Sequence, residues 1–307
     1  MPIVSTSTSA FYETARRNIA DLRSQAEALQ GQLGSGAKLA RSSDDPVAAS
    51  RLRNLARLEK LANIDTTNAD RATADLTLTD AAMSNMADTI IRAQELAMRA
   101  SSTTLNAEQL SALGQELEQI HNNLLGLANS RDSNGHALFG GESTGDAYQL
   151  DAGGNAVYIG TASTTDLPLG EGQSVTRAMT GPQVLQFTDA GGNQTDVMAT
   201  VKALAEALKG ASADPAGAAR DALASLQTGL DTLTTAQTVV GTRLAWIELT
   251  GERRTDLQEL RTVEEANLGA TDIASTIATL QETLTVLEAS QASFAKLAGL
   301  TLFDHIR

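Results

Sequence analysis

The sequence contains no cysteine, few aromatic side chains and fewer basic than acidic ones. Without cysteine there is no disulfide framework, thiolate zinc site or cysteine nucleophile, although extracellular proteins can also lack cysteine. Lys and Arg number 23 against 37 Asp and Glu, which gives a formal net charge of −14 over 307 residues. Because binding to nucleic acid needs clustered Lys and Arg to displace counterions, nucleic acid is not an expected partner.

Long apolar runs are missing as well. No window of 18 residues is continuously apolar, so we expect no membrane-spanning helix. The first 34 residues have neither the basic start nor the apolar stretch of a secretory signal, so we expect any export to use a route without a cleaved signal peptide. The five Phe, three Tyr and one Trp are few for a chain that is 42% hydrophobic. This composition favours narrow helix–helix contacts lined by Ala, Leu, Ile and Val.

Both ends of the chain carry a stripe of residues at alternating spacings of three and four, the pattern of a coiled coil. The amino-terminal stripe is Tyr12, Ala15, Ile19, Leu22, Ala26, Leu29 and Leu33. The carboxy-terminal stripe is Ile273, Ile277, Leu280, Leu284, Leu287, Gln291, Phe294 and Ala298. We expect the two ends to pair as a long antiparallel coiled coil within a mainly α-helical protein. The pattern fits an ordinary helix hairpin within one chain and contacts between copies equally well.

Capping signals predict three helices between these ends. An Asp or Asn before the first turn accepts orphan amide hydrogens, and Pro fits the first helical position. The starts are Asp45-Pro46, Asn106 with Gln109 three residues on, and Asp214-Pro215; the first helix should reach about Ala100 and the last should weaken near Gly251. Their apolar stripes run from Leu76 to Ala97, from Leu110 to Leu127 and from Leu223 to Ile247.

Residues 131–196 differ from the rest of the chain. They hold 8 acidic and 2 basic residues, are rich in Gly, and contain short alternating runs typical of strands. The pentapeptide Asp-Ala-Gly-Gly-Asn occurs twice, at 151–155 and 189–193, each time after such a run. Because Gly and Asn supply the positive φ angles of hairpin turns, we predict a small antiparallel β insert here.

No combination of side chains predicts an active site, a cofactor site or a metal site. His121, His136 and His305 are far apart in sequence and form no ligand motif, and His121 is expected on the flank of an apolar stripe. The adjacent Asp44 and Asp45 could form an acid/base pair, but capping of the following helix accounts for Asp45. Each Asp-Ala-Gly-Gly-Asn turn offers only two side-chain oxygens, fewer than calcium takes. We therefore expect no enzyme, no cofactor and no metal.

Four segments, in order along the chain, resemble the flagellin family. Residues 32–49 resemble its amino-terminal signature, a heptad helix that ends at a Ser-Gly hinge, here Gly34 and Gly36, before a Ser-Asp-Asp-Pro cap, here Asp45 and Pro46. Residues 132–141 resemble the hairpin that follows the second helix, with Asp132, Gly135, Phe139 and Gly140. Residues 240–244 and 299–303 are similar to a carboxy-terminal helix motif and to the end of the family's hook-to-filament subunit.

The resemblance implies a structural component of the bacterial flagellum, located outside the cell. Such a subunit joins the hook, through the first hook-associated protein, to the flagellin filament, as a ring of copies in a helical tube. It implies export through the flagellar type III channel and an export chaperone that binds residues 271–298. Residues 5–8 and 303–306 depart from filament flagellins, whereas the final Arg307 is flagellin-like. A minor filament-forming flagellin is therefore an alternative, followed by a surface sugar-binding relative with Tyr148 and Tyr158 as its stacking platform.

The resemblance also implies a division into three domains. Residues 1–40 with 270–307 would form the terminal coiled coil of the inner tube. Residues 41–130 with 197–269 would form a helical rod domain, and residues 131–196 would be an outer β-rich insert. The stripe residues of both chain ends would then be the assembly seam.

Overall fold

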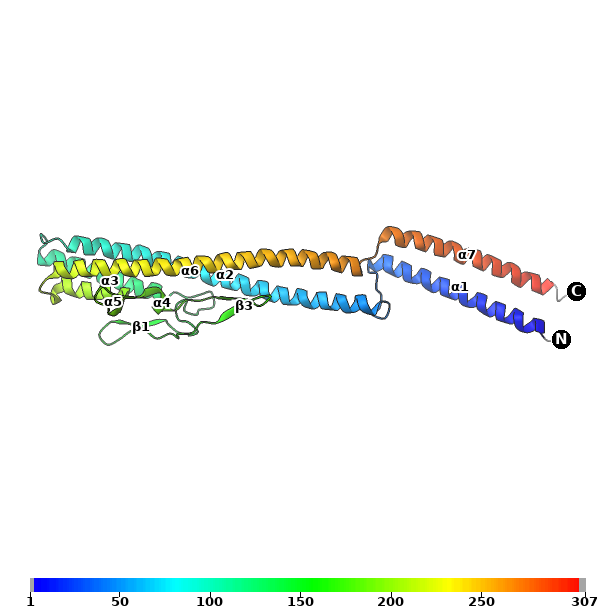
Figure 1. The fold of residues 1–307 in the computed structure, drawn as a ribbon, viewed down its shortest axis with the longest axis horizontal. Coiled ribbons are helices and arrows are strands. Elements are labelled where there is room, and N and C mark those ends of the chain that lie inside the picture. Colours follow the sequence, from blue (N-terminus) through cyan, green and yellow to red (C-terminus); the bar gives the residue numbers. More distant parts are fainter. Residues whose placement is uncertain (1–2, 304–307) are drawn as a thin grey trace. The chain divides into compact units, whose positions relative to one another are not determined.

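The computed structural model describes residues 3–303, with side chains for residues 10–297. The side chain of Ala298, the last residue of the predicted stripe, lies outside the described residues. Residues 304–307 of the predicted ending lie outside them altogether. The fold is mainly α-helical (Figure 1). The long helices are α1 (Ile3–Ser35), α2 (Pro46–Ala100), α3 (Ala107–Ala128), α6 (Pro215–Gly269) and α7 (Ile273–Phe303); shorter ones are α4 (Gly181–Leu185), α5 (Val197–Glu206) and a π-helical turn at Ala207–Ala211.

Within the described residues, six short strands form three separate antiparallel pairs. They are β1 (Tyr148–Leu150) with β2 (Ala156–Tyr158), β3 (Asp166–Gly170) with β4 (Gln173–Thr176), and β5 (Gln186–Thr188) with β6 (Gln194–Asp196). The predicted fold class, long helices with a small antiparallel β insertion, is confirmed. The predicted insert consists of three separate hairpins and not of one continuous sheet.

The chain divides into two compact units. Unit 1 consists of Met1–Lys60 and Thr255–Arg307, and unit 2 of Leu61–Arg254. Helices α2 and α6 each contribute to both units. The three domains expected from the sequence divide the chain at other positions and remain predictions.

The predicted capping signals start the helices as expected. The carboxylate of Asp45 accepts hydrogen bonds from the amides of Val47 (3.1 Å) and Ala48 (3.0 Å), and α2 begins at Pro46. Asn106 and Gln109 exchange hydrogen bonds in a capping box at the start of α3. Each start thus satisfies amide groups that the helix itself leaves unpaired.

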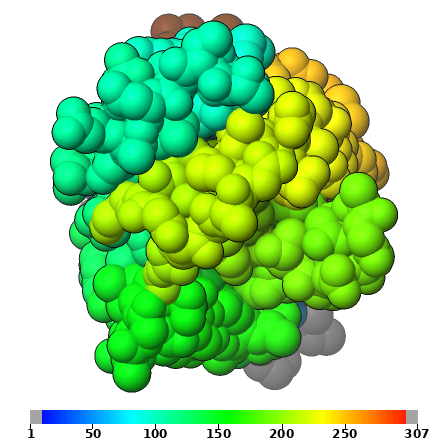
Figure 2. All heavy atoms as spheres, turned by 90° about the vertical axis from the view of Figure 1, so that its left-hand side faces the viewer, coloured from blue at the N-terminus to red at the C-terminus, as the bar shows by residue number. Residues whose placement is uncertain are grey.

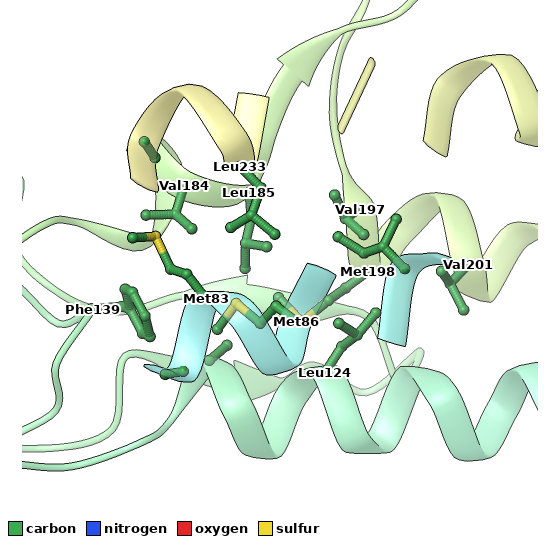
Figure 3. Close-up of a cluster of buried hydrophobic side chains, with 14 of the residues drawn as sticks. Met83, Met86, Leu124, Phe139, Val184, Leu185, Val197, Met198, Val201 and Leu233 are labelled. Carbon is green, nitrogen blue, oxygen red and sulfur yellow. The ribbon is translucent and has the colours of Figure 1, made fainter. Parts of the chain in front are cut away.

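The core of unit 2 lies where α2, α3, α5 and α6 meet. Figure 3 shows side chains from these helices and from α4 pointing toward one another, with methionines at the centre. The predicted stripes of α2, α3 and α6 all face this core, and Met83, Met86 and Leu124 are completely buried. In Figure 2 the turquoise turn between α2 and α3 lies beside the yellow-green start of α6 at the end of this unit. Flexible Met side chains fill a core that has few rings.

Two details of the helices differ from the sequence prediction. Helix α6 does not weaken near Gly251 but continues to Gly269. His121, predicted on the flank of a stripe, is only 6% exposed. The reason is that α5 packs along α3 and covers the side of α3 that carries this residue.

Candidate assembly surfaces

Helices α1 and α7 pair along their length in unit 1 (Figure 1). Tyr12 of α1 stacks edge to face on Phe294 of α7, with ring centroids 5.5 Å apart and planes at 90°. The Tyr12 hydroxyl donates a hydrogen bond to the carbonyl oxygen of Leu297, 3.3 Å away. The two chain ends that the sequence paired therefore lie together. On α1, the residues of the predicted stripe are all buried or half-buried.

The stripe of α7 that faces inward is only partly the predicted one. Leu280, Leu287 and Phe294 are buried or half-buried, but the positions between them are filled by small hydroxyl residues. These are Thr276, Thr283 and Ser290. Small side chains let the two helices approach closely, and a buried hydroxyl need not lose a hydrogen bond, because Thr283 Oγ1 donates to the carbonyl oxygen of Thr279 on its own helix (2.8 Å).

The remaining predicted residues of α7 lie on an exposed flank of the helix. Ile273 is 60% exposed, Ile277 42% and Leu284 36%, and Gln291 is exposed beside them. We name Ile273, Ile277 and Leu284 the free flank of α7. Water usually meets the polar face of a helix, and α7 instead exposes large aliphatic side chains, these three on the free flank and Val286 and Leu297 outside it. The free flank is therefore a candidate surface for contact with another chain.

The loop between α1 and α2 is hydrogen-bonded to the loop between α6 and α7. Ala37 and Ala270 form an antiparallel bridge, in which the amide of Lys38 donates to Gly269 (2.7 Å) and the amide of Thr271 donates to Gly36 (3.0 Å). Gly36 has a φ of +70°, which favours glycine, and it follows α1 directly. Gly34, predicted as part of the hinge, lies inside the last turn of α1.

Helices α2 and α6 also run side by side in unit 1. Arg51 makes a two-pronged ion pair with Glu264, with Nε–Oε1 and Nη2–Oε2 distances of 2.5 and 2.8 Å. The guanidinium lowers the pKa of the Glu264 carboxyl through its hydrogen bond and its charge. A groove of about 610 Å³ lies between the same helices, lined by Leu52, Arg53, Ala56, Thr262, Glu265, Ala266, Gly269 and Ala270.

The segment predicted as a hairpin is a tight loop in unit 2. The carboxylate of Asp132 accepts hydrogen bonds from the amides of Asn134 and His136, both at 2.8 Å. Burial raises the pKa of this carboxyl, but the hydrogen bonds outweigh burial and the pKa is lowered. Gly135 has a φ of +85°. Single bridges take the place of paired strands here, one of them from Gly140 to Thr180, and Phe139 is buried in the core.

Both Asp-Ala-Gly-Gly-Asn segments form the turns that the sequence predicted. Asp151 and Asp189 each accept amide hydrogen bonds from residues two and four positions further on, within 2.9 Å. The side-chain amide of Asn155 and these backbone bonds lower the pKa of the Asp151 carboxyl, and the backbone bonds lower the pKa of the Asp189 carboxyl. In the described part of the chain, no three His, Asp or Glu side chains group as a metal site would require. The described helices also include none that is long and apolar enough to cross a membrane.

Two features of these surfaces were not predicted from the sequence. Only one stripe was predicted on α7, although Thr276, Thr283 and Ser290 repeat at the same heptad spacing one position earlier than Ile277, Leu284 and Gln291. That second repeat is visible in the sequence and could have signalled two adjacent seams. The groove between α2 and α6 had no sequence signal, because it depends on how two distant segments meet.

The chain matches known proteins over most of its length. A model of the bacterial flagellin N-terminal helical region matches residues 6–144. Flagellar hook-associated protein 3 of Escherichia coli (strain K12) is 26% identical, over 97% of this chain and 98% of that protein. The structure of a candidate flagellar hook-associated protein from Vibrio parahaemolyticus has a TM-score of 0.68 at 19% identity, over 74% of this chain and all of that one. The flagellar junction protein FlgL from Legionella pneumophila gives a TM-score of 0.60 at 15% identity, over 72% of this chain and all of that one.

These matches and the paired helical chain ends define a flagellar structural subunit. The chain is similar to the flagellin family over residues 6–144, and its likeness to hook-associated protein 3 extends over 97% of its length. The resemblance predicted from the sequence is thereby confirmed.

Proposed function

We propose that this protein joins the flagellar hook to the flagellin filament and that it does so by packing its chain ends into the wall of a tube. One observation supports this proposal above the others. The free flank of α7 exposes Ile273, Ile277 and Leu284 next to the face that α1 covers. Burying such side chains against another chain stabilises an assembly by about 25 cal/mol per Å² of apolar surface.

In this proposal the α1–α7 pair forms the inner layer, and the free flank packs on neighbouring copies. The first hook-associated protein would lie on the hook side and flagellin on the filament side. The role is structural and involves no catalysis. The chain would leave the cell through the flagellar type III channel, for which the absence of disulfides is suitable, and an export chaperone would cover residues 271–298 before assembly.

Deletion of the gene tests the role. Electron microscopy of the deletion strain should show hooks without filaments, and flagellin should be shed into the medium. Intact filaments of altered shape would instead identify a minor flagellin, the alternative that the final Arg307 favours. Unchanged binding and thermal stability with sugars would speak against the sugar-binding relative.

Substitutions in α7 test the proposed surface. The variant Ile277→Asp with Leu284→Asp should be exported but should leave hooks without filaments. The reason is that two charged groups would have to be desolvated where the free flank packs on a neighbouring copy. The matched control is Ala278→Asp with Thr285→Asp, which adds the same charge to exposed positions outside the free flank. Filaments in both strains would contradict the proposal. Circular dichroism of the two purified variants establishes that each one folds.

A further inference from the structure

Unit 1 has two unlike sides where α2 runs beside α6. The Arg51–Glu264 ion pair marks one side, which we name the ion-pair flank. The groove of about 610 Å³ marks the other, which we name the groove flank. With 3.6 residues per helical turn, Arg51 and Arg53 lie about 200° apart around α2, and Glu264 and Glu265 lie about 100° apart around α6. The two flanks therefore present different side chains.

The groove flank is shallow, apolar at its base and basic along the α2 rim. Ala56, Ala266 and Gly269 line the base and leave room for larger side chains. Along the α2 rim, Arg53, Arg57 and Lys60 follow one another at spacings of four and three, and all three are exposed. These three cations form no ion pair with any residue that the structure describes, whereas the α6 rim carries Glu265.

The outer face of α6, turned away from α2, has the opposite character. Leu260 is 67% exposed and Val263 is 60% exposed, although both are aliphatic. They continue a stripe that begins at Asp256, with spacings of four and three, and Glu259 lies next to it. Neither Asp256 nor Glu259 has an ion-pair partner among the described residues. The outer face of α6 thus offers two apolar side chains bordered by two unpaired carboxylates.

We propose that the outer face of α6 in one copy docks into the groove flank of the next. Leu260 and Val263 enter the groove over Ala56 and Gly269, and Asp256 and Glu259 face the basic α2 rim. Charge complementarity selects a second copy as the occupant, because the same chain carries both members of the pair. The contact is heterologous, so it repeats from copy to copy and closes into a ring or continues as a helix. The inference rests on the proposed assembly role and adds a lateral contact that the free flank of α7 does not supply.

Cross-linking tests the proposal cleanly because the chain has no cysteine of its own. Cells would make two single-cysteine variants together, Ala56→Cys and a tagged Val263→Cys, and sheared flagella would be oxidised. A mixed dimer of the two variants is the expected product. The matched control replaces Ala56→Cys by Asn54→Cys, which lies on α2 toward the ion-pair flank. A mixed dimer with Asn54→Cys and none with Ala56→Cys would overturn the proposal, as would capture of Val263→Cys by a different flagellar protein.

Charge reversal gives a second test that does not require cysteine variants to assemble. Arg53→Glu with Arg57→Glu, and separately Asp256→Lys with Glu259→Lys, should each lower the number of filaments per cell by about tenfold or more. All four substitutions together should restore filaments, because the pairing is then reversed and not lost. Failure of the combined variant to exceed either pair overturns the proposal.

The two proposals can fail separately. Filaments that survive Ile277→Asp with Leu284→Asp, together with the mixed dimer, would remove the α7 surface and keep the lateral contact. The opposite result would be hooks without filaments in the α7 variant, and normal filaments but no mixed dimer in the cysteine-variant strain. That result would exclude the lateral contact and support the α7 surface.

Discussion

The ring of Tyr12 meets the ring of Phe294 edge to face across 282 positions of sequence, at a centroid distance of 5.5 Å. The other large side chains between α1 and α7 are aliphatic, and the inward positions of α7 are partly Thr and Ser. We therefore expect this pair to hold the chain ends together more strongly than any other single contact.

Phe294→Ala should loosen the α1–α7 pair by about 1–3 kcal/mol, less than a fully buried ring costs, because Phe294 is only half-buried. Hydrogen exchange of amides in both helices should speed up together. Tyr12→Phe keeps the ring and loses one hydrogen bond, so its effect should be smaller, about 0.5–1.5 kcal/mol. Equal effects of the two variants would show that the hydroxyl matters more than the ring stacking.

Asp45→Ala should destabilise the start of α2 by about 0.5–2 kcal/mol, because two amide groups lose their acceptor. Asp45→Asn is the matched control, since its side-chain oxygen can still accept. Thermal unfolding followed by circular dichroism compares the two. An Asn variant as unstable as the Ala variant would indicate that charge, not the hydrogen bonds, stabilises this end.

Two glycines of α6 should respond in opposite directions to alanine. A Cβ at Gly229 would lie 2.6 Å from Cγ2 of Val197 and 3.1 Å from Cε1 of Phe187, so Gly229→Ala should cost about 1–3 kcal/mol. A Cβ at Gly241 would meet nothing within 4 Å, so Gly241→Ala should stabilise the helix by up to about 1 kcal/mol. Urea unfolding measures both. A stable Gly229→Ala variant would mean that α5 does not pack this closely on α6.

Arg254 fixes the β3–β4 hairpin to α6. Its Nη1 donates to the carbonyl oxygens of Asp65 (3.1 Å) and Leu169 (3.0 Å). Arg254→Met should cost about 1.5–3 kcal/mol, because two partly buried carbonyls lose a charged donor. Trp246, the single tryptophan of the chain, lines a pocket of about 240 Å³ together with Leu169 and Arg254. In Arg254→Met the fluorescence emission of Trp246 should therefore shift to longer wavelength.

The neighbouring Arg253 provides the control for this experiment. Its Nε lies 3.1 Å from the carboxylate of Glu171, but the pair is exposed to solvent. Arg253→Met should therefore have a smaller effect on stability and leave Trp246 emission nearly unchanged. A larger shift in this variant than in Arg254→Met would reverse the assigned roles.

Stability should fall as the pH is lowered from 7 to 5, because of His121. Burial lowers the pKa of this imidazole, and the nearby ammonium of Lys202 on α5 lowers it further. Asn122, Asp196 and Glu118 favour the charged form but act against larger effects. The folded protein then binds a proton less readily than the unfolded chain, so the free energy of unfolding decreases by at most about 1.4 kcal/mol per pH unit from this group.

His121→Leu removes the titrating ring and should flatten the stability profile over this range. Urea unfolding at half-unit steps of pH measures the profile. The pKa of the Asp196 carboxyl, raised by burial, acts with the opposite sign at lower pH, so the comparison stays above pH 5. A slope that is the same in both proteins would show that His121 is not responsible.

The sequence predicted the core seams of α2, α3 and α6 correctly because each of these helices has one apolar side. Met83 and Leu124 could occupy only the inward positions of their heptads. The case of α7 is different, since Thr283 and Leu284 both continue an acceptable heptad and only packing against α1 decides between them. Hydrophobicity favoured Leu284, whereas close helix approach favoured Thr283.

The burial of His121 and the groove between α2 and α6 were beyond prediction for another reason. Both depend on segments at least 69 positions apart in sequence, α3 with α5 and α2 with α6. A periodic pattern locates the apolar side of one helix, but it does not identify which helix covers it or what space remains between them.

The bridge between Ala37 and Ala270 has a mechanical consequence. If the two loops were not bonded to each other, α1 and α7 could rotate independently, and the two helices would have to pair again after export. The backbone hydrogen bonds from Lys38 to Gly269 and from Thr271 to Gly36 instead hold the two loops together as one joint. Any turn of one terminal helix about that joint must carry the other with it, so the chain ends can change direction while their register is preserved.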